Sequence, residues 1–301
     1  MSQPMPDRPR GARLTMLNSM AGRDLPAALD RHVEWGLEVL DLKDCLFGKA
    51  VMDLTDEDAG RAANMVERRG LSVWCMSTHL FCDDVERGEL HFAAQHAGRV
   101  ERAVELARIL RPALVRLLAA GGERRCMYDD CVEYLAAEHP WLIPMYAQAI
   151  DRLHAAGFQA TIENEVGPCI LRTPADVTAL FAELGRREKV CFTYDVQNLW
   201  QMGTFPTMHV YEQLRGLIGY LHLKGGQCDD GDSERTLRWR SSLAEASWPV
   251  AEITRRAVAD GVCPVVCLNP SHGRPRQEGK WEDFTKDDLN FIRESVPEID
   301  E

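Results

Sequence analysis

Side chains that bind metals or move protons stand where three late hydrophobic segments of the sequence end. Glu163 and Asp195 each follow such a segment directly, and His222 lies near the end of a third. Carboxylates and an imidazole together suit a divalent ion such as Mn²⁺, Co²⁺, Mg²⁺ or Zn²⁺. If the fold brings the three segment ends together, the sequence predicts a site for one divalent metal ion.

Each of these residues also has an ordinary structural interpretation. A single acidic residue after a strand is usually a helix cap or a solvated loop residue, and Asp195 fits a cap for a helix starting near Val196. A lone histidine in a hydrophobic strand, such as His222, is more often a hydrogen-bonded core residue. Three such residues at the same level of three consecutive strands are rarely a coincidence, and this favours the metal site.

Further polar residues follow other segments and are candidates for proton transfer. His79 follows the third segment, although a hydrogen-bonded loop histidine would look the same. Glu165 shares a strand face with Glu163 only if that strand continues; otherwise it is a loop charge. Both are predicted as catalytic candidates beside Glu163.

Short apolar runs alternate with longer amphipathic stretches along the chain. The eight apolar runs are 14–17, 37–42, 71–76, 113–118, 158–162, 190–194, 217–223 and 262–268. Helical periodicity predicts helices over 24–36, 55–69, 90–110, 139–156, 174–187, 207–215, 248–260 and 284–295. Helix-start signals occur at Asp24, Thr55, Thr173 and Thr285, and left-handed glycines are expected at Gly70, Gly157 and Gly261.

Eight apolar strands, each followed by a helix, predict a parallel sheet closed into a single (β/α)₈ barrel. The alternative, an open doubly wound sheet, would normally carry a glycine-rich phosphate loop after an early strand, and none follows Leu17 or Leu42. No Gly-, Ser- or Pro-rich linker divides the chain. We therefore expect a frayed tail over residues 1–12 and one barrel over 13–301, with long loops at 78–90, 119–138 and 224–247.

Composition limits the partners of the protein. The 301 residues include 35 Lys and Arg against 47 Asp and Glu, for a net charge of −12, which disfavours nucleic acid. No apolar stretch is long enough to predict a membrane span, and the polar amino terminus does not resemble a signal peptide. Ten scattered cysteines without a CxxC pair indicate reduced thiols, so we expect a cytoplasmic protein. Homo-oligomerisation stays open.

Three motifs resemble the xylose-isomerase-like barrels, a family that includes sugar-phosphate isomerases and epimerases, inosose dehydratases and endonuclease IV. These motifs are TIENEV, YDVQN and YLHLKGG, and the resemblance extends from about Arg13 to Ile292. It implies that Glu163, Asp195 and His222 are metal ligands. It also implies substrate or nearby contacts from Asn198, Lys224, His272 and one of Arg235, Arg238 and Arg240.

The sequence departs from the family at one position. The family usually places a glutamate after the eighth strand, and this chain has Asn269, whose amide oxygen can ligate a cation but cannot accept a proton. Two-base epimerisation would then need a second group from Glu165, His79 or His272.

These observations predict a metal-dependent isomerase or epimerase that acts on a sugar, polyol or related hydroxy-carbonyl compound by proton transfer through an enediolate. The alternatives are a dehydratase or other lyase of the same superfamily and a non-catalytic sugar-binding pseudoenzyme. A phosphodiesterase like endonuclease IV is disfavoured, because Asn198 stands where that site has a histidine.

Overall fold

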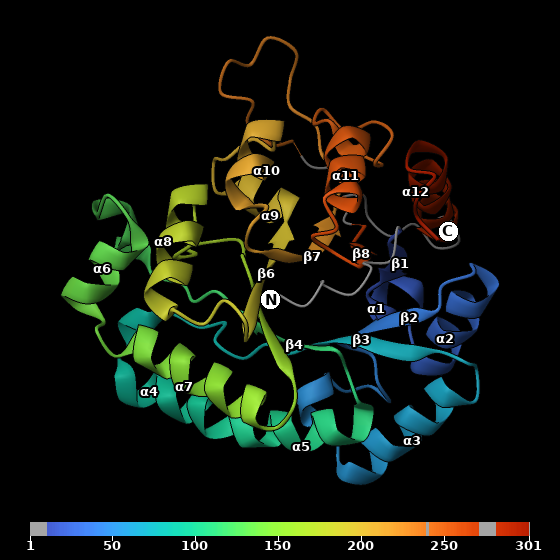
Figure 1. Cartoon of the computed structure of the whole chain (residues 1–301), viewed down its shortest axis with the longest axis horizontal. Coiled ribbons are helices and arrows are strands. Elements are labelled where there is room, and N and C mark those ends of the chain that lie inside the picture. Colours follow the sequence, from blue (N-terminus) through green and yellow to red (C-terminus); the bar gives the residue numbers. More distant parts are fainter. Residues whose placement is uncertain (1–10, 239–240, 271–280, 301) are drawn as a thin grey trace, which may run out of the picture.

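The computed structural model describes residues 11–238, 241–270 and 281–300 (Figure 1). Its eight strands are β1 (Arg13–Met16), β2 (Val39–Leu42), β3 (Ser72–Ser77), β4 (Leu114–Leu118), β5 (Gln159–Glu163), β6 (Val190–Asp195), β7 (Ile218–Leu223) and β8 (Val265–Leu268). Every ladder is parallel, and the order β1-β8-β7-β6-β5-β4-β3-β2 places each strand beside its neighbours in the chain. A single parallel bridge between Leu17 and Asp41 joins the two ends of the sheet. The predicted (β/α)₈ barrel is confirmed.

Helices surround the strands on the outside of the barrel (Figure 1). They are α1 (Asn18–Ala21), α2 (Leu25–Glu34), α3 (Asp56–Glu67), α4 (Glu89–Gln95), α5 (Val100–Leu110), α6 (Cys131–Glu138), α7 (Leu142–Ala155), α8 (Pro174–Leu184), α9 (Val196–Gln201), α10 (Met208–Leu214), α11 (Val250–Ala259) and α12 (Trp281–Ser295). Within the described part of the chain, no helix has the length and apolar character needed to cross a membrane.

Local signals account for most helix boundaries. Asp24, Thr55 and Thr173 cap α2, α3 and α8 through their side chains, as predicted. Gly70, Gly157 and Gly261 have φ angles of 69°, 91° and 62°, the left-handed region that glycine tolerates best.

Some expectations are wrong in detail. The helix predicted over 90–110 is two helices, α4 and α5, separated by residues 96–99. The helix predicted to start at Thr285 begins four residues earlier, at Trp281. The predicted loop 119–138 contains α6, which Asp130 caps. Ala12, which we placed in the frayed tail, is 3% exposed and pairs with Ile299.

The core has two parts. The larger cluster lies between the strands and the surrounding helices, as expected for strands that are apolar on both faces. The smaller cluster comes from six of the eight strands, without β1 and β5, and from the residue after β1: Leu17, Val39, Cys75, Leu114, Cys191, Tyr220, Val265 and Cys267. Packing of both clusters fixes the positions of the strands. The polar residues at their carboxyl ends therefore lie on a rigid scaffold.

Candidate functional site at the carboxyl ends of the strands

The register of the parallel strands places the three predicted ligands at one level. Glu163 is the last residue of β5 and pairs with Thr193, and Asp195 is the last residue of β6 and pairs with His222 of β7. One ligand atom from each of Glu163, Asp195 and His222 lies within 4.8 Å of the others. All three side chains are almost fully buried. The fold therefore brings together residues that are up to 59 positions apart.

His222 links the two carboxylates. Its Nδ1 lies 2.9 Å from Oε1 of Glu163 and 3.8 Å from Oδ2 of Asp195. Burial alone would lower the pKa of His222, but the charge of Glu163 and the further interactions with Cys267, Asp195 and Asp41 together raise it well above its ordinary value. Burial alone would raise the pKa of Glu163, but the charges of His222 and Arg116 hold it well below the usual range. Glu163 is therefore an ionised carboxylate.

Arg116 of β4 is a site residue that the sequence analysis missed. Its Nη1 lies 2.6 Å from Oε2 of Glu163, and both side chains are 2% exposed. Its Nη2 and Nε donate to the carbonyl of Thr78 at 3.1 and 3.3 Å. A charged residue inside the apolar run Leu-Val-Arg-Leu-Leu is a signal that could have identified it, since buried arginines are almost always paired.

A second network surrounds Asp195. Its Oδ2 lies 2.7 Å from Nζ of Lys224, and its Oδ1 accepts from the backbone N–H of Asn198 at 3.0 Å, which caps α9. Asp195 is thus both a helix cap and a member of the cluster. Lys224 also donates to Oδ1 of Asn198 at 2.8 Å, so the two predicted substrate contacts touch each other. Asn164, which the sequence analysis overlooked, accepts from the backbone N–H of Asp195 at 3.0 Å.

Asn269 joins this group of polar residues from the position directly after β8. Its backbone N–H donates to the carbonyl of Leu223 at 3.0 Å, and its side-chain Nδ2 lies 3.5 Å from Oδ2 of Asp195. The side chain is 7% exposed. The position where the family usually has a glutamate therefore faces the same group of ligand atoms.

The proton-transfer candidates lie on loops beside this cluster. Glu165 is half-buried two residues beyond the end of β5; burial raises its pKa, and the charge of Glu163 raises it further. His79 is exposed after β3; partial burial of its ring lowers its pKa, as does the charge of Arg116. Glu165 is therefore a loop carboxyl with raised proton affinity rather than a strand residue.

Two of the predicted arginines contact residues outside the ligand cluster: Arg235 contacts the segment between α9 and α10, and Arg238 contacts its own loop. The guanidinium of Arg235 lies 4.6 Å from the ring centre of Phe205, and Arg238 pairs with Asp229 at 2.7 Å. Both are exposed. Arg240 and His272, also predicted as substrate contacts, lie outside the described residues.

The residues present suit a divalent cation. Two carboxylates, an imidazole and the amide of Asn269 are oxygen and nitrogen donors of the kind that Mg²⁺, Mn²⁺, Co²⁺ or Zn²⁺ accepts. Bonds of about 2.0–2.2 Å bring ligand atoms to roughly 3–4 Å from one another, so a small contraction of the cluster would be enough. Arg116 and Lys224 already neutralise the two carboxylates, which lowers the attraction for a cation.

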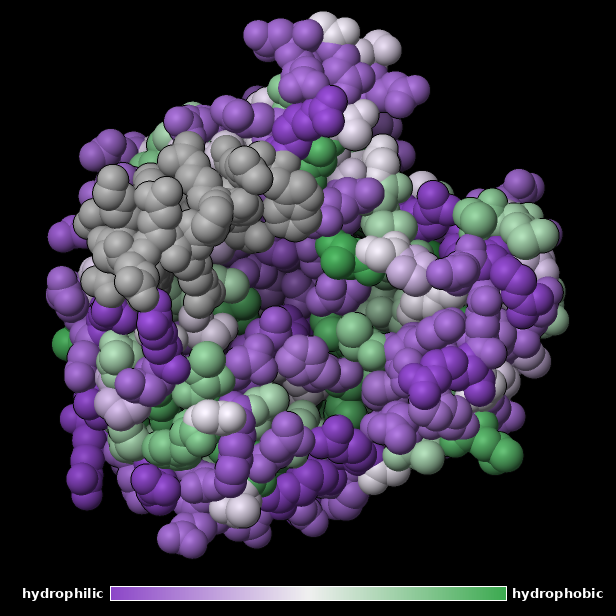
Figure 2. All heavy atoms as spheres, turned by 180° about the vertical axis from the view of Figure 1, so that it is seen from behind, coloured by the Kyte–Doolittle hydropathy of each residue, from purple (hydrophilic) through white to green (hydrophobic). Residues whose placement is uncertain are grey.

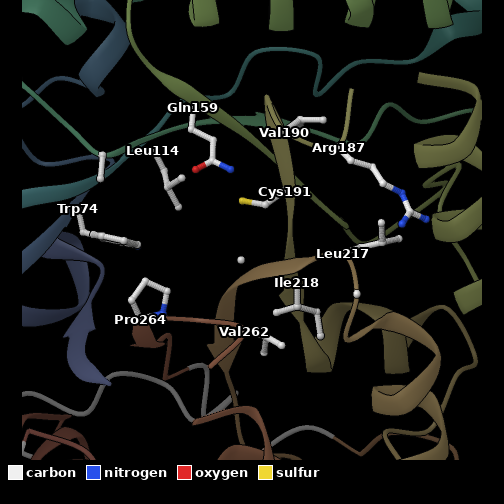
Figure 3. Close-up of a pocket in the computed structure, with 13 residues that line it drawn as sticks. Trp74, Leu114, Gln159, Arg187, Val190, Cys191, Leu217, Ile218, Val262 and Pro264 are labelled. Carbon is white, nitrogen blue, oxygen red and sulfur yellow. The ribbon is translucent and has the colours of Figure 1, made fainter. Parts of the chain in front are cut away.

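The opposite end of the barrel has a cavity of about 300 Å³ without such a cluster (Figure 3). It is lined by Trp74 and by first residues of strands or their neighbours, such as Leu114, Gln159 and Val190. Active sites of these barrels lie at the carboxyl ends of the strands. Seen from behind, the molecule has a largely hydrophilic surface that is hollowed near its middle (Figure 2).

Comparison with known proteins assigns the family. The model of the xylose isomerase-like TIM barrel family matches residues 29–294. The chain belongs to this family, in agreement with the resemblance of its motifs. No curated protein matches the chain.

Several solved structures share the fold. An L-ribulose 3-epimerase is 17% identical with a TM-score of 0.70 and 95% of each chain covered. The probable 3-DHS dehydratase AsbF of Bacillus anthracis is 14% identical with a TM-score of 0.67, covering 93% of this chain and 98% of that one. A xylose isomerase-like protein of Mycobacterium smegmatis, solved with magnesium, is 14% identical with a TM-score of 0.66, covering 95% and 96%. At these identities the likeness shows the fold alone.

Proposed function

We propose that the protein is a metal-dependent enzyme that isomerises or epimerises a sugar, polyol or related hydroxy-carbonyl compound. The observation that carries this proposal is the buried convergence of Glu163, Asp195 and His222, whose ligand atoms lie within 4.8 Å of one another. The Nδ2 of Asn269 lies 3.5 Å from Oδ2 of Asp195, and the amide turned over would offer its oxygen as a neutral fourth ligand. A divalent ion held there would bind adjacent substrate oxygens and acidify the C–H bond between them.

Three residues suit metal ligation, proton removal and stabilisation of negative charge, respectively. Glu163 is held ionised by Arg116 and His222, so it suits a ligand better than a proton carrier, since an efficient base has a pKa near the working pH. Glu165 has a raised pKa and lies two residues away, so it is the better candidate for removing the proton. Lys224 offers a cation that offsets charge developing on a substrate oxygen.

The neutral Asn269 favours chemistry that needs one base. An amide cannot return a proton to the opposite face of the substrate carbon. Isomerisation in which the proton leaves and returns on the same face is therefore the first candidate. Dehydration, which also starts with removal of one proton, is the second. AsbF, described as a probable 3-DHS dehydratase, is among the proteins with this fold, at 14% identity.

Two measurements test the proposal together. Elemental analysis of protein purified without added metal should find about one divalent ion per chain. In heavy water, a panel of ketoses, inososes and hydroxy acids should include a compound that takes up deuterium in one stereochemical sense. If no compound exchanges with Mn²⁺, Co²⁺, Mg²⁺ or Zn²⁺ supplied in turn, the protein is a sugar-binding pseudoenzyme instead.

A further inference from the structure

The far side of the His222 ring faces a buried carboxylate that the proposed function does not use. Asp41 of β2 and His222 are both 0% exposed, and Oδ2 of Asp41 lies 3.7 Å from Nε2 of His222. Nε2 of His222 and Oδ1 of Asp41 are both buried polar atoms without a hydrogen-bond partner. The unpartnered Nε2 of His222 thus faces a carboxylate whose Oδ2 lies slightly beyond hydrogen-bond distance and whose Oδ1 has no partner.

Asp41 is held in place by the strand that carries His222. The hydroxyl of Tyr220, two residues before His222 in β7, donates to Oδ2 of Asp41 at 2.9 Å. Tyr220 is also 0% exposed, and its ring lies 4.7 Å from the His222 ring in an edge-on arrangement. Within the described part of the chain, the only ion pair of Asp41 is the one with His222. A fully buried carboxylate is costly unless a donor satisfies it, so His222 is its natural partner.

The two ring nitrogens of His222 have different surroundings. Nδ1 faces Glu163 and Asp195, on the side of the ligand cluster, whereas Nε2 faces Asp41. An imidazole that offers the lone pair of Nδ1 to a cation carries its proton on Nε2. That N–H would be buried without an acceptor unless Asp41 received it.

We propose that Asp41 is a positioning residue: it accepts the Nε2–H of His222 and so keeps the Nδ1 lone pair available at the ligand cluster. Tyr220 orients the carboxylate for this task. The expected effect on metal affinity rests on the proposed metal-dependent function, whereas the contact between Asp41 and His222 does not. Histidine ligands of metals generally donate their other N–H to a carboxylate, carbonyl or water, and loss of that partner weakens binding about 10–100-fold.

Cys267 offers a rival arrangement on the same side of the ring. Asp41, His222 and Cys267 also have ligand atoms within 4.8 Å of one another. If these three residues held a cation themselves, it would bind Nε2, and Nδ1 would carry the proton. The two arrangements therefore assign opposite nitrogens of His222 to the metal.

The test is ¹⁵N-histidine NMR combined with zinc titration against a chelator, with the His222 signals assigned from the spectrum of His222→Gln. The wild type should show a protonated Nε2 without zinc, and with zinc it should keep that proton and shift at Nδ1. Asp41→Asn should bind zinc about 10–100-fold more weakly. Asp151→Asn, at a partly exposed ion pair with Arg186, is the matched control and should leave the zinc affinity and the His222 signals unchanged.

Three outcomes would overturn the inference. One is an unprotonated Nε2 in the wild type, another is an unchanged zinc affinity in folded Asp41→Asn, and the third is loss of zinc binding in Cys267→Ala. If Asp41→Asn fails to fold, the wild-type spectra alone decide. If the wild type binds no zinc or other divalent ion, the proposed function fails, whereas the spectrum without zinc still tests the contact with Asp41.

Discussion

Replacing Glu163 by Gln separates the structural role of this carboxylate from its chemical one. The change keeps the side-chain volume but removes the charge that pairs with Arg116 at 2.6 Å and with His222 at 2.9 Å. The amide oxygen can accept from only one side, and the NH₂ group then faces the other donor. Glu163→Gln should therefore leave buried Arg116 partly uncompensated.

The expected cost follows from burial. Removing one partner of a buried ion pair destabilises a protein by about 3–5 kcal/mol, because the remaining charge loses its compensation in a region that excludes water. At about 2 °C per kcal/mol for a chain of this size, Tm should fall by roughly 6–10 °C. Turnover should fall as well, because the site loses the charge of one proposed ligand.

The pH dependence has a defined sign. The pKa of Glu163 in the folded state lies below its unfolded value, so its contribution to stability is complete above the unfolded pKa and is lost as pH falls toward the folded one. The difference in free energy of unfolding between wild type and Glu163→Gln should thus shrink on acidification from about pH 6 to pH 3.

The assay is chemical denaturation across this pH range, together with turnover on the active compound from the panel. Glu101→Gln is the matched control, because Glu101 forms an exposed ion pair with Arg152 at 2.6 Å. Such pairs contribute about 0–1 kcal/mol. If Glu163→Gln is no less stable than Glu101→Gln, the buried pair does not compensate Arg116 as argued.

Three further predictions concern other residues. Glu165→Gln should lower turnover by about 10²-fold or more while Tm stays within about 1 °C, and retained activity would show that Glu165 is not the base. Asn269→Glu should raise zinc affinity about tenfold or more in a chelator competition, because it adds a charged ligand; an unchanged affinity would place Asn269 outside the ligand shell. Burial lowers the pKa of His32, so the free energy of unfolding should fall as pH drops below about 6.5, where the unfolded chain binds the proton more readily. His32→Gln should flatten that part of the pH profile, and a curve identical to the wild type would contradict this.

The barrel was predictable because each strand is a continuous apolar run and each helix has a regular period. β5, predicted over 158–162, spans Gln159–Glu163, a shift of one residue. The helix caps Asp24, Thr55 and Thr173 could also be predicted from the local sequence, because a cap depends only on the next three residues. α6 was missed although Asp130 and Glu133 supply a usable start signal for it.

Part of the site was predictable for a different reason. Glu163, Asp195 and His222 stand at strand ends, and a parallel barrel gathers all such ends at one mouth. Arg116 and Asp41 lie inside strands. The charge within the apolar run 114–118 marks Arg116 as unusual, but no local signal shows the partner of either residue. Their partners are 47 and 179 positions away, and only the register of the closed barrel reveals them.

The charges gathered at the mouth explain why Asn269 matters more than a single lost ligand. Arg116 pairs with Glu163, and Lys224 pairs with Asp195, so the two carboxylates expected to hold a cation are already matched by two fixed positive charges. In a relative with glutamate at position 269, one carboxylate would remain in excess. In this chain a cation must compete with both side chains and with the proton on Nδ1 of His222, which has to leave before that nitrogen can bind. An ion bound here as proposed should therefore be held weakly and in exchange with protons, and Asp41, behind the ring, is the group that we propose keeps His222 available for it.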